Sequence, residues 1–100
     1  MDFDISKNMI QNVDSLRYLI NLTTLRFQEN QIKNIDSIKY LVKLNKLNIS
    51  NNQIQTIDSL KDLTNLTELE IRWNKISNFT PIRNHQNYLK YQIRGQYDFE

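Results

Sequence analysis

The chain has 100 residues with 13 basic and 11 acidic side chains, so its formal charge of +2 argues against the broad basic surface that binds nucleic acid. It contains no cysteine, which excludes disulfides, thiolate metal sites and cysteine nucleophiles. A hydrophobic fraction of 39% is typical of a globular protein, and we expect one domain over residues 1–100.

The N-terminal residues MDFDISKNMI carry Asp2, Asp4 and Lys7. They therefore lack the basic start and the unbroken apolar run of a signal peptide. No apolar run in the chain approaches the length of a membrane span. We expect a cytoplasmic or nuclear protein that does not contact a membrane.

Apolar residues recur every 22 positions along the chain, without an insertion before residue 80. One apolar column contains Phe3, Leu25, Leu47, Leu69 and Tyr91, and another contains Ile5, Phe27, Ile49, Ile71 and Ile93. Such a period indicates stacked units that share one core. The predicted repeats are residues 3–24, 25–46, 47–68 and 69–90.

Each repeat begins with an L-x-L alternation, which predicts a strand with one buried face. An asparagine follows each strand, and these four are Asn8, Asn30, Asn52 and Asn74. Its amide can bond backbone groups of the loop and of the next repeat, which would otherwise be buried without partners. We expect these four asparagines to be structural.

Apolar residues spaced by three complete each repeat and predict a tight helical turn packed on one side. Asp14, Asp36 and Asp58 stand just ahead of these segments, where a carboxylate can cap free N–H groups. A calcium-binding ladder is the alternative, but the motif lacks the further oxygen ligands that calcium requires. The aspartates are therefore predicted to be caps, and no metal is expected.

The unit L-x-L-x-x-N-x-I-x-x-I-D-S-L-x-x-L-x-x-L resembles the leucine-rich repeat, in the 22-residue class found in a protein phosphatase 1 regulator and in bacterial internalins. The resemblance covers residues 3 to about 82. It implies an α/β solenoid, a short curved right-handed superhelix with a parallel sheet on the concave side. Three-ten or short helical turns would form the convex side, and protein partners would bind the concave face without a cofactor.

The pattern changes towards the end of the chain, where Thr80 and Pro81 replace the Asp-Ser pair. Residues 80–100 are predicted to be an atypical capping remnant, in which Tyr91 and Ile93 imitate a fifth strand. No capping segment precedes Phe3. Exposed apolar ends would favour self-association, or they would indicate a fragment of a longer protein.

The sequence offers little for catalysis, and an enzyme is not expected. His85, the only histidine, occupies a leucine column and suits a half-buried capping residue. With Gly95 as the only glycine, a glycine-rich phosphate loop cannot form. Glu68 and Glu70 are paired carboxylates, but nothing apolar nearby suits either of them to act as a general acid.

Side chains that alternate with the buried leucines should lie on the concave face. The predicted partner-binding residues are Trp73, Arg72, Arg94, Glu70, Glu68, Asn48, Arg26 and Gln28. Trp73 stands out because its column otherwise contains Lys7, Glu29, Asn51 and Gly95. It is predicted to form an aromatic and basic patch with the two arginines, Glu70 and Tyr97, because Trp and Arg concentrate binding energy.

Two alternatives stay open for this face. In the first, opposite charges on this face neutralise one another, both among Lys46, Glu68 and Lys90 and between Asp4 and Arg26. Trp73 could fold over Asn51 or over the final repeat as a local lid.

For the whole chain, the predicted function is a regulatory or scaffolding protein-binding module. The other hypotheses are a structural section of a longer repeat protein, and a ribonucleoprotein component that contacts RNA only indirectly.

Overall fold

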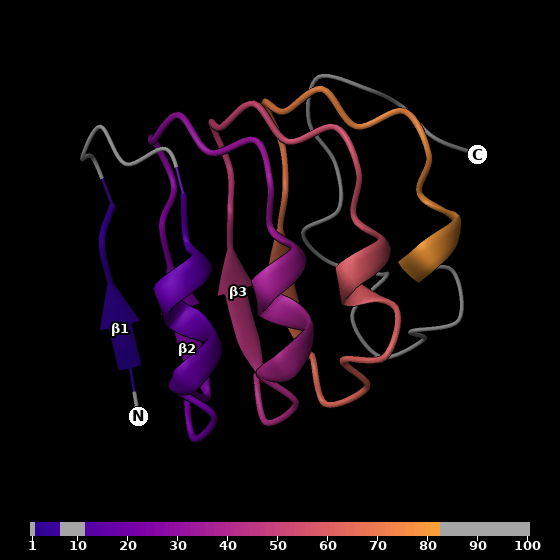
Figure 1. The fold of residues 1–100 in the computed structure, drawn as a ribbon. Helices are drawn as coiled ribbons and strands as arrows, with labels where there is room; N and C mark the ends of the chain where they lie inside the picture. Colours follow the sequence, from indigo (N-terminus) through magenta and orange to yellow (C-terminus); the bar gives the residue numbers. More distant parts are fainter. Residues whose placement is uncertain (1, 7–11, 83–100) are drawn as a thin grey trace.

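Strands and short helices alternate along the chain, one of each per repeat. The computed structural model describes residues 2–6 and 12–82. Its elements are β1 (Asp2–Asp4), η1 (Asp14–Tyr18), β2 (Thr24–Arg26), η2 (Asp36–Tyr40), β3 (Lys46–Asn48), η3 (Asp58–Leu60), β4 (Glu68–Glu70) and η4 (Thr80–Ile82), where η denotes a three-ten helix. Figure 1 shows the η helices together on one side of the row of strands.

The four strands form a parallel sheet in the order β1-β2-β3-β4. Each residue pairs with the residue 22 positions later, so that Leu25 lies beside Leu47 and Leu47 beside Leu69. The equal repeat length fixes this register, because a slip of one residue would turn every buried leucine towards solvent. The predicted parallel sheet and three-ten turns are confirmed.

One continuous core lies between the sheet and the η helices. Leu25 from β2, Ile38 from η2 and Ile54 from the connection are each fully buried, and all belong to the same cluster. Ile82 in η4 is also fully buried, so the regular packing extends to the end of the described residues. Burying a side chain of this size contributes about 1.5–3 kcal/mol, and the repeats therefore stabilise one another.

The asparagines after the strands form a buried ladder. Asn52 donates from Nδ2 to the carbonyl oxygens of Ile49 (3.0 Å) and of Phe27 in the preceding repeat (3.1 Å). Asn74 repeats this with Ile71 (3.1 Å) and Ile49 (2.9 Å). The expected contact with the next repeat is corrected, because Asn30, Asn52 and Asn74 all reach back to the preceding one. Asn8 lies outside the described residues.

The aspartates do not cap the η helices in the expected way. The N-cap positions are Val13, Ile35 and Ile57, without a side-chain cap hydrogen bond. Asp14, Asp36 and Asp58 are instead the first helical residues, where a negative charge still favours the free N–H groups.

Asparagines two residues before the first helical residue stabilise the turns that lead into η1, η2 and η4. The Oδ1 atoms of Asn12 and Asn34 each accept a hydrogen bond from an aspartate N–H, at 2.8 Å. Asn78 accepts the equivalent bond from Thr80 at 2.9 Å, although Thr-Pro replaces Asp-Ser there. Local side-chain acceptors of this kind stabilise a tight turn. The remaining positions of the predicted cap, residues 83–100, lie outside the described residues.

Candidate protein-binding surface

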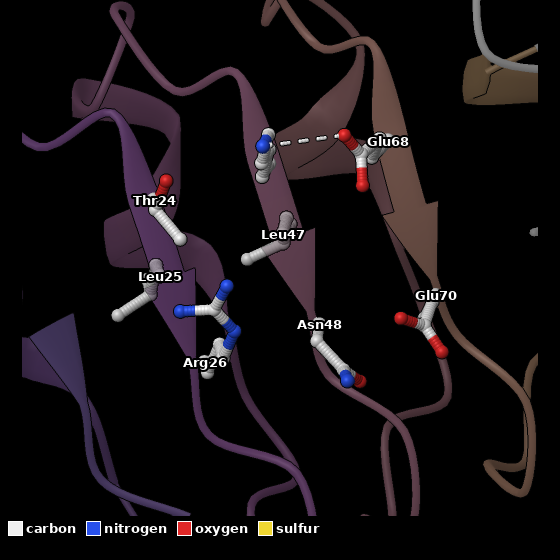
Figure 2. A pocket seen from close by; sticks show the side chains of 8 residues that line it. Thr24, Leu25, Arg26, Leu47, Asn48, Glu68 and Glu70 are labelled. Atoms are coloured by element: carbon white, nitrogen blue, oxygen red, sulfur yellow. Dashed lines mark ion pairs between the residues drawn. The ribbon is translucent and has the colours of Figure 1, made fainter. Parts of the chain in front are cut away.

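The exposed face of the sheet carries a pocket that spans β2, β3 and β4. Figure 2 shows its lining residues, which are Thr24, Leu25, Arg26, Lys46, Leu47, Asn48, Glu68 and Glu70. The pocket encloses about 280 Å³, part of which is open solvent. The in-register pairing places Arg26 beside Asn48 and Asn48 beside Glu70. Four of the predicted contact residues, Arg26, Asn48, Glu68 and Glu70, are therefore brought together.

Two ion pairs cross this surface. Lys46 Nζ lies 3.5 Å from Glu68 Oε2, and the dashed line in Figure 2 marks this pair. Arg72, which has no partner in its own column, lies 3.7 Å from Glu70 through Nη2 and Oε1. All four side chains are 38–54% exposed. Such pairs contribute about 0–1 kcal/mol each, so a partner can displace them at low cost.

At the first strand, Asp4 accepts hydrogen bonds from the side chain and the backbone N–H of Ser6. These bonds favour the carboxylate, and the side-chain bond is the stronger cause of its lowered pKa. The positive charge of Arg26, beside Asp4 in the sheet, lowers this pKa further. Within the described residues, however, Asp4 and Arg26 do not form the ion pair that the sequence suggested.

Trp73 lies just beyond β4 in an unusual backbone conformation. Its φ is +62°, in the left-handed region, and the equivalent residues Glu29 and Asn51 have φ of +61° and +59°. Asn tolerates this conformation, whereas a bulky aromatic residue rarely adopts it. The indole is 53% exposed. The repeat geometry thus imposes the conformation, and burial alone does not explain why a tryptophan occupies the position.

In the 22-residue column that contains Gln28, Ser50 and Arg72, the first two side chains are less accessible than the sequence predicted. Gln28 is half-buried, and its Oε1 atom is buried without a hydrogen-bond partner within residues 2–6 and 12–82. Ser50, its neighbour in this column, is only 6% exposed. Arg94 and Tyr97 lie outside the described residues. The described part of the predicted patch is therefore Trp73, Arg72 and Glu70, of which Glu70 also lines the pocket.

Sequence reasoning missed a group of exposed apolar side chains on the opposite side of the molecule. They are Tyr18, Ile20, Tyr40 and Val42, with 78%, 56%, 42% and 52% of their surface exposed. The available signal is their 22-residue spacing. Tyr18 aligns with Tyr40, and Ile20 with Val42, in columns that become polar at Asp62 and Thr64 of the third repeat.

The described residues show no grouping of three or more His, Asp or Glu side chains that could hold a metal ion. Within the same residues, no helix has the length and apolarity to cross a membrane.

Comparisons with known proteins agree with this geometry. A family model described as leucine rich repeat matches residues 20–76, more than half of the chain. Internalin C2 from Listeria monocytogenes is 33% identical with a TM-score of 0.82, and the match covers 84% of this chain and 37% of that one. An internalin (inlF) from the same strain is 26% identical with a TM-score of 0.83, and the match covers 97% of this chain and 28% of that one.

This chain therefore spans about a third of the length of these two internalins. A search of curated proteins found no match. The repeat pattern, the parallel sheet with its asparagine ladder, and the family match lead to one conclusion: the chain belongs to the leucine-rich repeat family.

Proposed function

We propose that this chain binds a protein partner through the concave surface formed by the pocket and Trp73, in a regulatory or scaffolding role. Domains of this family are in general protein–protein interaction modules, which supports the class of function. The specific surface is supported by Trp73, a half-exposed tryptophan held at a φ of +62°. Tryptophan is among the residues most enriched in binding hot spots, and the same backbone position in the two preceding repeats is occupied by Glu29 and Asn51.

The surroundings of Trp73 suit a partner with mixed chemistry. Arg72 and Glu70 are paired and exposed, so each can exchange its present partner for a group on the bound protein. The indole offers an apolar surface on which an arginine, a lysine or an apolar side chain can pack. Polar groups of the pocket, among them Asn48, would then set the orientation of the bound segment.

A paired pull-down from cell lysate tests this function, with mass spectrometry of the retained proteins. The baits are the wild-type chain, Trp73→Gly and the matched control Asn51→Gly. Both glycine substitutions fit the left-handed conformation, but only the first removes the indole. We expect a protein that the wild type and Asn51→Gly retain and Trp73→Gly loses. Equal retention by all three baits would contradict the proposal.

Two other roles remain predictions, namely a structural section of a longer repeat protein and a ribonucleoprotein component. The cytoplasmic or nuclear location and self-association through the ends also remain predictions. A structural section of a longer protein would retain no partner in this experiment. A ribonucleoprotein component would retain proteins that disappear after ribonuclease treatment. An enzymatic role would require measurable turnover of a substrate, and leucine-rich repeat proteins are typically interaction modules without catalytic activity.

A further inference from the structure

The four exposed apolar residues on the convex side, Tyr18, Ile20, Tyr40 and Val42, are here called the convex patch. Tyr18 and Tyr40 end η1 and η2, which lie side by side in Figure 1. The guanidinium carbon of Arg17 in η1 lies 4.8 Å from the centre of the Tyr40 ring in η2. This contact joins the first two repeats across the patch.

The convex patch is not needed to complete the core. Leu16, Leu22, Ile38 and Leu44 already fill the corresponding interior positions, and each is at most 7% exposed. The patch residues lie between these buried positions in the sequence but are themselves exposed. Exposed apolar side chains gathered in this way, rather than scattered singly, indicate an interaction surface.

Two positively charged side chains lie at the Tyr40 ring. Lys39 Nζ lies 5.3 Å from the centre of the Tyr40 ring, so this ring has two cations over it, one from each repeat. Neither Arg17 nor Lys39 forms an ion pair with a carboxylate in the described part of the chain. An anionic group bound beside these two side chains would gain a charge attraction that no ion pair of the described residues supplies.

We propose that the convex patch is a second docking surface, which binds an acidic segment of a partner protein that also carries aliphatic or aromatic side chains. Charge complementarity with Arg17 and Lys39 selects the acidic groups, and Tyr18, Ile20 and Val42 select the apolar ones. Nucleic acid fits less well, because the formal charge of the chain is only +2 and offers no broad basic surface. The concave surface and the convex patch would then hold two different partners.

The test begins with the selection of short random peptides on the full chain. The enriched peptides are synthesised with a fluorophore and titrated by polarisation against four variants. Tyr18→Ser with Tyr40→Ser removes the apolar surface, and Arg17→Glu with Lys39→Glu reverses the charge. Lys33→Glu with Lys75→Glu makes the same charge change at exposed positions away from the patch. Trp73→Gly reports on the concave surface.

We expect enriched peptides that combine acidic with apolar residues and bind at least about tenfold more weakly to both patch variants. Their affinity for the control pair and for Trp73→Gly should be unchanged. The proposal is overturned if the enriched peptides lack acidic residues, if the patch variants bind equally well, or if binding is lost with Trp73. Circular dichroism checks each fold, and the charge reversal decides the outcome if the tyrosine pair fails to fold.

The same titrations include single-stranded RNA and vesicles that contain phosphatidylserine. Binding of either one that is tighter than peptide binding and is lost with the Arg17→Glu, Lys39→Glu pair would overturn the assignment to a protein segment.

Discussion

Asn52 Oδ1 accepts a hydrogen bond from the backbone N–H of Ile32, 20 residues earlier, at 3.1 Å. The same side chain donates to the Phe27 carbonyl, so one buried amide satisfies a donor and an acceptor of the preceding repeat. Asn74 makes the equivalent bond with Ile54, also at 3.1 Å. Each asparagine thereby fixes the spacing between its own repeat and the one before.

Asn52→Leu should therefore lower the free energy of unfolding by about 2–4 kcal/mol, because buried backbone groups lose their partners. Urea unfolding followed by circular dichroism measures this. Asn34→Leu is the control, since Asn34 is exposed and accepts one local bond, from Asp36. A loss for Asn52→Leu no larger than for Asn34→Leu would contradict the role of the ladder.

Truncation of a core side chain should lower the stability of the fold far more than truncation of a side chain in the convex patch. Ile54→Ala removes a fully buried side chain and should cost about 2–5 kcal/mol through lost burial and the cavity left behind. Ile20→Ala removes a side chain that is 56% exposed, and should change stability by only about 0.5 kcal/mol. Thermal unfolding of the two variants decides this. A large loss for Ile20→Ala would show that the convex patch serves the fold.

The backbone at Trp73 predicts an unusual order of stabilities. Trp73→Gly and Trp73→Ala both delete the indole, but only alanine keeps the Cβ atom that disfavours a φ of +62°. The glycine variant should therefore be more stable than the alanine variant by about 1 kcal/mol. Urea midpoints of the pair give the answer. If alanine is equal or better, the left-handed conformation at this position is not imposed by the repeat.

The carboxylate of Asp4 predicts a pH effect at the first strand. Its pKa in the folded chain lies below the ordinary value of 3.8, chiefly because of the Ser6 hydroxyl. The unfolded chain thus binds a proton more readily, and the stabilisation from Asp4 is complete above pH 3.8 and is lost as the pH falls through the folded pKa.

Ser6→Ala should raise the Asp4 pKa towards its ordinary value, which an NMR titration of the side-chain carboxyl carbon would detect. Substitution of a serine whose side chain lies far from Asp4, such as Ser77→Ala, serves as the control. An unchanged pKa in Ser6→Ala would assign the shift to another group.

Much of the fold could be predicted from the 22-residue spacing, because each apolar column corresponds to one position in the core. The spacing gave the strand register that places Leu25 beside Leu47, and the buried positions of Asn30, Asn52 and Asn74. It did not reveal which neighbour an asparagine bonds, because a repeating pattern looks the same in both directions along the chain. Only the path of the loop brings Asn52 to Phe27.

The candidate site was predicted less completely. The columns of Arg26, Asn48 and Glu70 are as expected. The pairing of Arg72 with Glu70 depends on side-chain rotamers, which a column pattern does not specify. The left-handed backbone at Trp73 had a signal in the sequence, since Asn51 and Gly95 share its column. Asn and Gly in one column indicate a left-handed backbone only when the turn at that position is known to require a positive φ.

The central claim is that the indole of Trp73 supplies binding energy on the concave surface. The most direct measurement is isothermal titration calorimetry of the partner identified by pull-down, against the wild type, Trp73→Gly and Asn51→Gly. We expect the first substitution to weaken binding by about 2 kcal/mol or more, as for a hot-spot tryptophan. Asn51→Gly should leave the affinity close to that of the wild type. Equal affinities for all three proteins would contradict the account.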